Sequence, residues 1–172
     1  MPLAETPAPA EDVVVDAWDS GLRVEAQQSA VLGAWAVANL GAGTTGALTA
    51  EAPFARSAWG TSAAWNTVNL ALAGGGALSV AARRRRGPPS LADVQRGHRG
   101  LQTALAVNLG LDALYVGTGA TMWAVGGEVR GVDVAGMGAG LVVQGLFLAA
   151  FDAIYLTRHR RSTRAVRGMY QH

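Results

Sequence analysis

The chain has 172 residues, of which half are hydrophobic and only 15% are charged, against about 25% in a typical soluble domain. It contains no cysteine, which excludes disulfides, thiolate metal sites and cysteine nucleophiles. All 14 basic residues are arginine. They gather around apolar stretches and form no continuous basic face with interleaved aromatics, so no nucleic-acid partner is predicted.

The N-terminal part of the chain differs in composition from the rest. Residues 1–10 are rich in proline and alanine, which predicts a disordered segment. In the segment 11–28, Val14, Trp18 and Leu22 recur at helical spacing. This spacing predicts an amphipathic helix that lies on the membrane surface or on the bundle. The segment is acidic, so attraction to anionic lipid is not expected to hold it there.

Four long stretches follow in which charged residues are almost absent. A helix needs about 20 mainly apolar residues to cross the hydrocarbon core of a bilayer. A helix of a soluble bundle would carry a polar outer face, which these stretches lack. We therefore predict an all-α integral membrane four-helix bundle over 29–157, with an N-terminal amphipathic helix. The expected spans are about 29–49, 60–82, 101–124 and 133–156.

The arginines predict the orientation of the bundle. They concentrate in the connection 83–100 and in the C-terminal segment 158–172, whereas the other two connections carry only Arg56 and Arg130. Arginine and lysine are enriched in cytoplasmic loops near the ends of spans. We therefore expect a multi-pass protein of the bacterial inner membrane with both termini in the cytoplasm and an Arg-rich cytoplasmic tail over 158–172.

The connection 83–100 also contains a signal for the start of a helix. After "GPPS" at 87–90, Ser90 and Asp93 have the spacing of a capping box. The third helix is therefore expected to begin near Leu91, ahead of the membrane.

Polar residues inside the predicted spans are the candidate functional residues. An aspartate at the centre of a span costs about 2.5–3.5 kcal/mol, and such residues almost always face the interior of the bundle. On the third span Asn108, Asp112 and Tyr115 share one face. The remaining candidates are Trp35 and Asn39 in the first span, Trp65, Asn66 and Asn69 in the second, and Gln144, Asp152 and Tyr155 in the fourth.

Counting along each span at about 1.5 Å per residue places one polar residue of each helix near the bilayer midplane. These residues are Asn39, Asn69, Asp112 and Gln144, and a common depth predicts a single hydrogen-bonded layer. The same count places Asp152 nearer the cytoplasmic end. It therefore argues against a pair of carboxyl groups formed by Asp112 and Asp152.

Small residues at four-residue spacing indicate where helices approach closely. Two such ridges occur, one on the first span and one on the fourth. They are Ala34, Ala38, Ala42 and Gly46, and Gly136 with Gly140.

No catalytic constellation is visible. The chain lacks the HExxH, Walker A and GxSxG motifs, so no enzyme activity is predicted. The histidines His98, His159 and His172 fall outside the predicted spans, in the cytoplasmic connection or the tail. Neither an intramembrane haem site nor any other cofactor or metal site is expected.

Three motifs resemble those of a known family. The "WAVANLG" of the first span, the "WNTVN" of the second and the "QGLFLAAFDAIY" of the fourth are similar to a family of small bacterial membrane proteins of unknown function with four spans. The resemblance covers about residues 28–160. It implies four spans but no activity.

Two functions are compatible with these residues. The polar layer can hold the helices together through hydrogen bonds. This role favours a structural or accessory protein that packs with itself or with a larger membrane complex. Alternatively, the chain is a small oligomeric transporter or proton-conducting protein that uses Asp112 together with Asn39, Asn69 and Gln144. The bilayer is the predicted partner in both cases.

Overall fold

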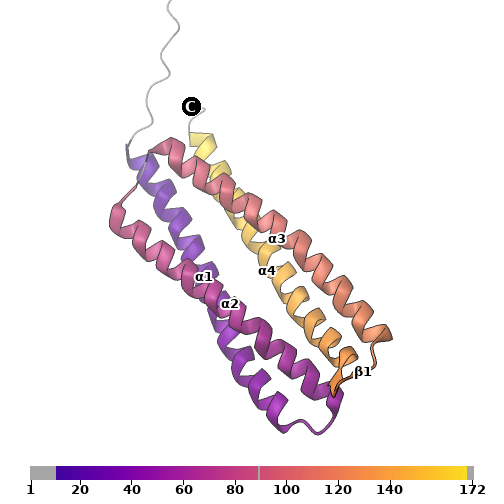
Figure 1. Cartoon of the computed structure of the whole chain (residues 1–172). Helices are drawn as coiled ribbons and strands as arrows, with labels where there is room; N and C mark the ends of the chain where they lie inside the picture. The colour runs from indigo at the N-terminus through magenta and orange to yellow at the C-terminus, as the bar shows by residue number, and fades with distance from the viewer. Residues whose placement is uncertain (1–10, 89, 170–172) are drawn as a thin grey trace, which may run out of the picture.

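The described residues, 11–88 and 90–169 of this computed structural model, form four long helices (Figure 1). The predicted disordered segment 1–10 and residues 170–172 lie outside them. The all-α prediction is confirmed. The elements are α1 (Glu11–Thr49), α2 (Pro53–Arg86), α3 (Leu91–Val125), β1 (Glu128–Val129), β2 (Val132–Asp133) and α4 (Val134–Met169).

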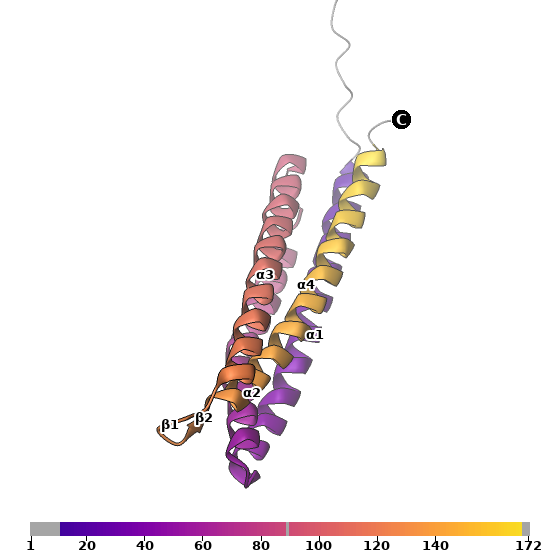
Figure 2. The ribbon, with the colours of Figure 1, turned by 90° about the vertical axis from the view of Figure 1, so that its right-hand side faces the viewer.

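The helices form two antiparallel pairs, α1 with α2 and α3 with α4 (Figures 1 and 2). The two pairs meet mainly through α2 and α4. Among the described residues α2 and α3 share no extensive interface, although the short connection after Arg86 joins them at the end at which α1 begins and α4 ends (Figure 1). The bundle is therefore less closely packed on the side between α2 and α3.

The N-terminal half of α1 differs from the prediction. The expected amphipathic helix 11–28 and the expected first span 29–49 form one continuous helix of 39 residues. No proline interrupts this stretch, so no residue in it forces the helix to end. Ala17 and Leu22 are buried at 3% and 2% exposure. The N-terminal half of α1 therefore packs along the bundle.

The helix boundaries around the arginine run follow local chemistry. Gly87 ends α2 with a positive φ of 77°, a conformation that glycine adopts without steric cost. The Ser90 hydroxyl then accepts a hydrogen bond from the Asp93 backbone N–H at 3.3 Å. The predicted cap is therefore confirmed, and α3 begins at Leu91 as expected.

A short hairpin that the sequence did not predict joins α3 to α4. Arg130 and Gly131 both have positive φ, 51° and 78°, as a tight two-residue turn between antiparallel strands requires. The Asp133 carboxylate then accepts a hydrogen bond from the backbone N–H of Gly136 at 2.7 Å. This bond caps the start of α4. At its other end α4 continues to Met169, so most of the predicted tail 158–172 is helical.

The small-residue ridges have different outcomes. Gly136 and Gly140 face the backbone carbonyls of α2, as predicted for a close approach. On α1, Ala34, Ala38 and Ala42 are exposed, whereas the last member of the ridge, Gly46, lies against the Trp59 ring of α2. Gly43 also approaches the backbone of α2 closely.

Length and hydropathy separate α4 from the other helices. Among the described residues one segment, Val134–Arg161, is long and apolar enough to cross a membrane, with a mean hydropathy of 1.9. The sequence predicted four such spans. In the other three helices the apolar residues are diluted by Gly, Ala, Ser, Thr and Asn, whose transfer free energies are small or unfavourable.

Candidate functional site

A hydrogen-bonded polar layer lies at the contact between α1, α2 and α4. Its centre is Gln144, which is fully buried. The Gln144 side-chain oxygen accepts hydrogen bonds from Trp35 Nε1 at 3.1 Å and from Asn66 Nδ2 at 3.0 Å. Its side-chain nitrogen donates to Ser62 Oγ at 2.8 Å. One amide therefore joins three helices.

Two further asparagines complete this layer. Asn39 Oδ1 accepts a hydrogen bond from Ser62 Oγ at 3.3 Å, and Asn69 Nδ2 donates to Asn66 Oδ1 at 3.1 Å. The structure thus brings together three of the four residues expected in a common layer, together with Trp35 and Asn66. Ser62 was missed, although its spacing to Asn66 and Asn69 places the three on one helical face.

Asp112 is not part of the polar layer, so the predicted single layer of four residues is wrong. Asp112 forms a side-chain hydrogen bond with Asp152 instead. Where α3 packs on α4, Gly145 lies against Val116 and the backbone of Asp112. This close packing brings the Asp152 side chain near that of Asp112. The depth count failed because a count along each helix does not tell how far one helix is shifted along its neighbour.

The carboxyl pair formed by Asp112 and Asp152 is almost completely buried, at 3% and 5% exposure. Asp152 also forms a side-chain hydrogen bond with Asn108. The second oxygen of Asp112, Oδ2, is buried and has no hydrogen-bond partner among the described residues. Two carboxyl groups this close together in a buried site repel each other when both are charged, so the arrangement is suited to sharing one proton.

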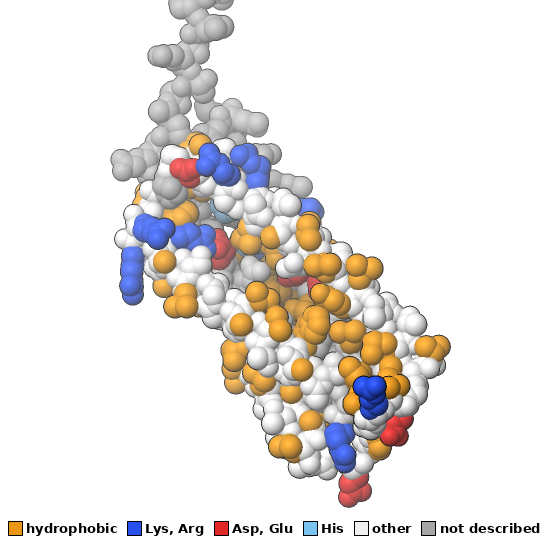
Figure 3. Space-filling view, viewed as in Figure 1, with side chains coloured by type: hydrophobic (Ala, Val, Ile, Leu, Met, Phe, Trp, Pro, Cys, Tyr) orange, Lys and Arg blue, Asp and Glu red, His pale blue; other side chains and the backbone are white. Residues whose placement is uncertain are grey.

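The carboxyl pair lines a cleft of about 400 Å³ on the open side of the bundle, between α2 and α3. Figure 3 shows this hollow with acidic side chains inside it and apolar side chains around it. Its apolar walls are Leu32, Val68, Leu72, Ala73, Leu101, Leu111, Leu148 and Phe151. The predicted residues Trp65, Asn69, Asn108 and Tyr115 also line it.

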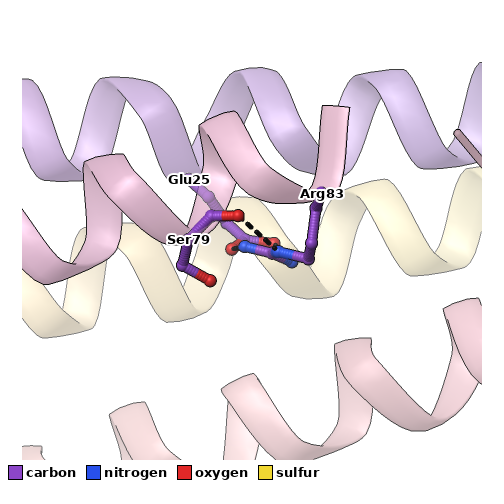
Figure 4. Close-up of polar contacts among 3 residues, drawn as sticks. All are labelled: Glu25, Ser79 and Arg83. Carbon is purple, nitrogen blue, oxygen red and sulfur yellow. Dashed lines mark hydrogen bonds and ion pairs between the residues drawn. The ribbon is translucent and has the colours of Figure 1, made fainter. Parts of the chain in front are cut away.

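Paired side chains bound the cleft at both ends. At one end the rings of Trp65 and Tyr115 meet edge to face with centroids 4.8 Å apart, which joins α2 to α3. At the other end Arg83 forms an ion pair with Glu25 of α1 and donates to the carbonyl of Ser79 (Figure 4). Neither Glu25 nor Arg83 was singled out from the sequence, because each lies at the margin of a predicted span.

The remaining aromatic candidates support the packing of α4. Trp35 stacks on Phe147 with ring centroids 3.8 Å apart. Tyr155 packs on Phe151 at 4.8 Å and is buried in the apolar core with Leu32 and Leu105. Tyr155 therefore lies outside both the polar layer and the cleft.

Two histidines lie beyond the Glu25–Arg83 end of the cleft. The sequence placed His98 and His159 in a loop and a tail, but they lie on α3 and α4 at 9% and 0% exposure. Their ring centroids are 6.3 Å apart. Burial lowers the pKa of His98; Glu25 opposes this change and Arg83 adds to it. Burial of His98 therefore favours its uncharged form.

The described residues contain no group of three or more His, Asp or Glu side chains arranged to hold a metal ion. The polar and aromatic groups that line the cleft are the carboxyl groups of Glu25, Asp112 and Asp152, the Arg83 guanidinium, the amides of Gln28, Asn69 and Asn108, the hydroxyls of Ser29 and Ser79, and the rings of Trp65, Tyr115 and Phe151.

Comparison with protein families gives one match. The model of a family described as "Family of unknown function (DUF6992)" matches residues 31–153, well over half of the chain. Neither the curated proteins nor the solved structures contain a match. The matched segment includes the whole polar layer and the carboxyl pair.

Proposed function

The chain belongs to the family of unknown function DUF6992, and we propose that it is a four-span protein of the bacterial inner membrane that moves protons or a proton-coupled solute through its cleft. The proposal has two parts, the membrane location and the activity of the carboxyl pair. The sequence resemblance to small bacterial four-span proteins agrees with the first part.

The distribution of charge supports insertion of all four helices. Within 26–50, 57–82, 100–127 and 134–157 the charged residues are Asp112 and Asp152, and both are buried. The outward surface of this band is therefore uncharged. It exposes large apolar side chains on every helix, for example Val37 at 61%, Leu72 at 62%, Leu114 at 65% and Ile154 at 57%. Soluble monomers rarely expose apolar surface on this scale.

The position of the arginines supports cytoplasmic termini. The α2–α3 connection and the end of α4 lie at the same end of the bundle as the start of α1, and Figure 3 shows a concentration of basic side chains there. The opposite end carries Arg56 and Arg130. The enrichment of arginine on the cytoplasmic side of spans then places both termini in the cytoplasm.

The observation that carries the proposed activity is the carboxyl pair in the cleft. The polar layer around Gln144 already supplies hydrogen bonds between helices, so packing does not require two buried acids. Ionisable groups at membrane depth mark ion pathways and proton relays. Asp112 and Asp152 both line the cleft, to which all four helices contribute residues.

We test this with the purified protein in liposomes that contain a pH-sensitive dye, driven by a potassium diffusion potential. We expect proton entry into liposomes with the wild-type protein, and Asp112→Asn and Asp152→Asn to reduce its rate at least tenfold, because an amide cannot carry a proton. Asp16→Asn, which removes an exposed acid of α1 far from the pair, is the matched control and keeps the wild-type rate. If both cleft variants keep the wild-type rate of proton entry, the carboxyl pair does not carry the proton.

An accessory role within a larger complex is the second candidate. The exposed ridge of Ala34, Ala38 and Ala42 on α1 favours it, because such ridges permit close approach of another helix. Native mass spectrometry of the protein released gently from its own membrane separates the two functions. A different protein at fixed stoichiometry supports the accessory role, and a homo-oligomer alone supports transport.

A further inference from the structure

We infer that the ligand of the cleft is a monovalent organic cation with an apolar body, held with its positive group against the carboxyls of Asp112 and Asp152. This inference rests on the proposed function, since it names the class of solute that the same site takes. It depends on the charge balance of the cleft, the unpartnered oxygen, the walls and the access route.

The charge balance of the cleft favours a cation. The charged side chains that line it are Glu25, Arg83, Asp112 and Asp152. Glu25 and Arg83 neutralise each other in an ion pair. The carboxyl pair has no basic side chain beside it in the cleft, so its negative charge can be balanced only by a proton or by a cationic ligand.

The unpartnered oxygen points to the same ligand class. The Asp112 side chain lines the cleft and is only 3% exposed. Its Oδ2 atom has no hydrogen-bond partner among the described residues. A buried polar atom of this kind costs about 1–3 kcal/mol when nothing satisfies it. Oδ2 itself is enclosed, so a positive group in the cleft would offset part of that cost by attraction to the Asp112 carboxyl group as a whole.

The walls of the cleft favour a ligand whose body is apolar. They consist mainly of Leu, Val and Phe side chains, and the rings of Trp65 and Tyr115 close one end. Aromatic faces attract organic cations, most strongly where water is excluded. A volume of about 400 Å³ falls within the usual range of about 300–1,000 Å³ for small-molecule sites.

A metal ion fits this cleft less well than an organic cation. Calcium takes six to eight oxygen ligands and magnesium needs near-octahedral geometry. The carboxyl pair, with Asn108 already bonded to Asp152, offers too few oxygens in one place, and the described residues form no cluster of three metal ligands.

The access route suits a solute that dissolves in lipid. The cleft opens between α2 and α3, which share no extensive interface among the described residues. In the proposed membrane orientation this opening faces the acyl chains. A cation with an apolar body can enter from there, whereas a small hydrated ion would have to shed its water in lipid.

Cation and proton then compete for the same two carboxyl groups. When the cation binds, the proton of the pair is released, and when the pair takes the proton back, the cation leaves. The other titratable or charged groups that line the cleft are Glu25 of α1, Arg83 of α2 and Tyr115 of α3. Because Glu25 and Arg83 are paired with each other, the carboxyl pair is the group expected to set the pH dependence of binding.

The test measures binding of two probes of equal shape and opposite charge to the full-length protein in neutral detergent. Tetraphenylphosphonium is the cation and tetraphenylborate is the anion, and equilibrium dialysis gives the bound amount of each. We expect saturable binding of the cation at least tenfold tighter than that of the anion, with an affinity that rises with pH. Equal binding of both probes would overturn the inference, because it would show partition into detergent or an apolar surface.

Variants locate the binding site. Asp112→Asn and Asp152→Asn are each expected to weaken binding of the cation at least tenfold, and Asp16→Asn to leave it unchanged. Circular dichroism checks that each variant is folded. If a variant does not fold, the comparison of the two probes on the wild-type protein still tests the inference. Wild-type cation affinity in both cleft variants would also overturn the inference.

Failure of this inference and failure of the proposed function give different results. If neither probe binds saturably but the cleft variants still abolish proton entry in liposomes, the proposed function stands and the ligand class is wrong. If the cation binds through the carboxyl pair but no proton entry is seen, the ligand class stands and the chain is a binding protein.

Discussion

The polar layer around Gln144 and the carboxyl pair of Asp112 and Asp152 are both buried, yet they differ in how their polar atoms are satisfied. In the layer, both polar atoms of the Gln144 side chain bond to groups on α1 and α2. In the pair, Asp112 Oδ2 has no partner among the described residues. A satisfied network stabilises the fold, whereas an unsatisfied buried acid is costly to it.

Packing explains this difference. Gly140 lets α4 approach the backbone of α2 closely, so side chains of α1, α2 and α4 meet around Gln144. The carboxyl pair lies between α3 and α4 and lines the cleft, where α2 and α3 share no extensive interface. Buried polar residues thus bond to one another where three helices converge, and they line a cleft where α2 and α3 do not pack together.

The largest effect on stability is expected from Gln144→Leu. The substitution removes three bonds between helices, and at about 0.6 kcal/mol for each such bond the free energy of unfolding falls by about 2 kcal/mol. Unfolding in mixed micelles of increasing SDS fraction measures it. Thr121→Val is the control, because Thr121 is exposed and bonds only to its own helix. Equal stability of the leucine variant and the wild-type protein would show that the layer does not hold the helices together.

A smaller loss is expected from Gly140→Ala. The new methyl group would lie 2.6 Å from the Ala58 carbonyl oxygen, so α4 must move away from α2, at a cost of at least about 1 kcal/mol. Gly110→Ala on α3 is the matched control, since no atom lies within 4 Å of its added methyl group. Alanine is the better helix former, so the control is expected to be as stable as the wild-type protein or slightly more so. The same SDS titration measures both. An equal effect of the two substitutions would mean that α4 is not tightly held at the polar layer.

The smallest effect on stability is expected from Asp112→Asn, although it abolishes the proposed activity. An amide keeps a hydrogen bond to Asp152 and removes a buried acid, so the free energy of unfolding should change by less than about 1 kcal/mol. The SDS titration and the liposome assay are run on the same preparation. A loss as large as that of Gln144→Leu would place Asp112 among the residues that hold the fold, and the contrast between the two regions would disappear.

The helical fold could be predicted in detail where local rules apply. The capping residues Ser90 and Asp93 mark the start of α3, and uncharged stretches mark four helices. The link between the predicted helix 11–28 and the first span could not be predicted, because a continuous helix and two helices joined end to end have the same periodicity. The family match and the resemblance agree that the chain belongs to a family without an assigned activity.

The candidate site was predicted as a set of residues but not as an arrangement. Asn39, Asn69 and Gln144 do meet, because their helices pack closely enough for short amide side chains to touch. The pairing of Asp112 with Asp152 was argued against from a count of residues along each helix. That count carries no information on how far one helix slides along its neighbour.

The sequence by itself determined the four long uncharged helical stretches, their apolar surfaces and the polar residues that must turn inward, because these follow from periodicity and from the cost of placing polar groups among apolar ones. The tertiary structure alone decided which polar residues meet. Its register brings Asp112 to Asp152 and separates both from Gln144, and the lack of an extensive interface between α2 and α3 leaves the cleft open. Register and helix packing depend on contacts between residues far apart in the chain, which the pattern of any single helix does not contain.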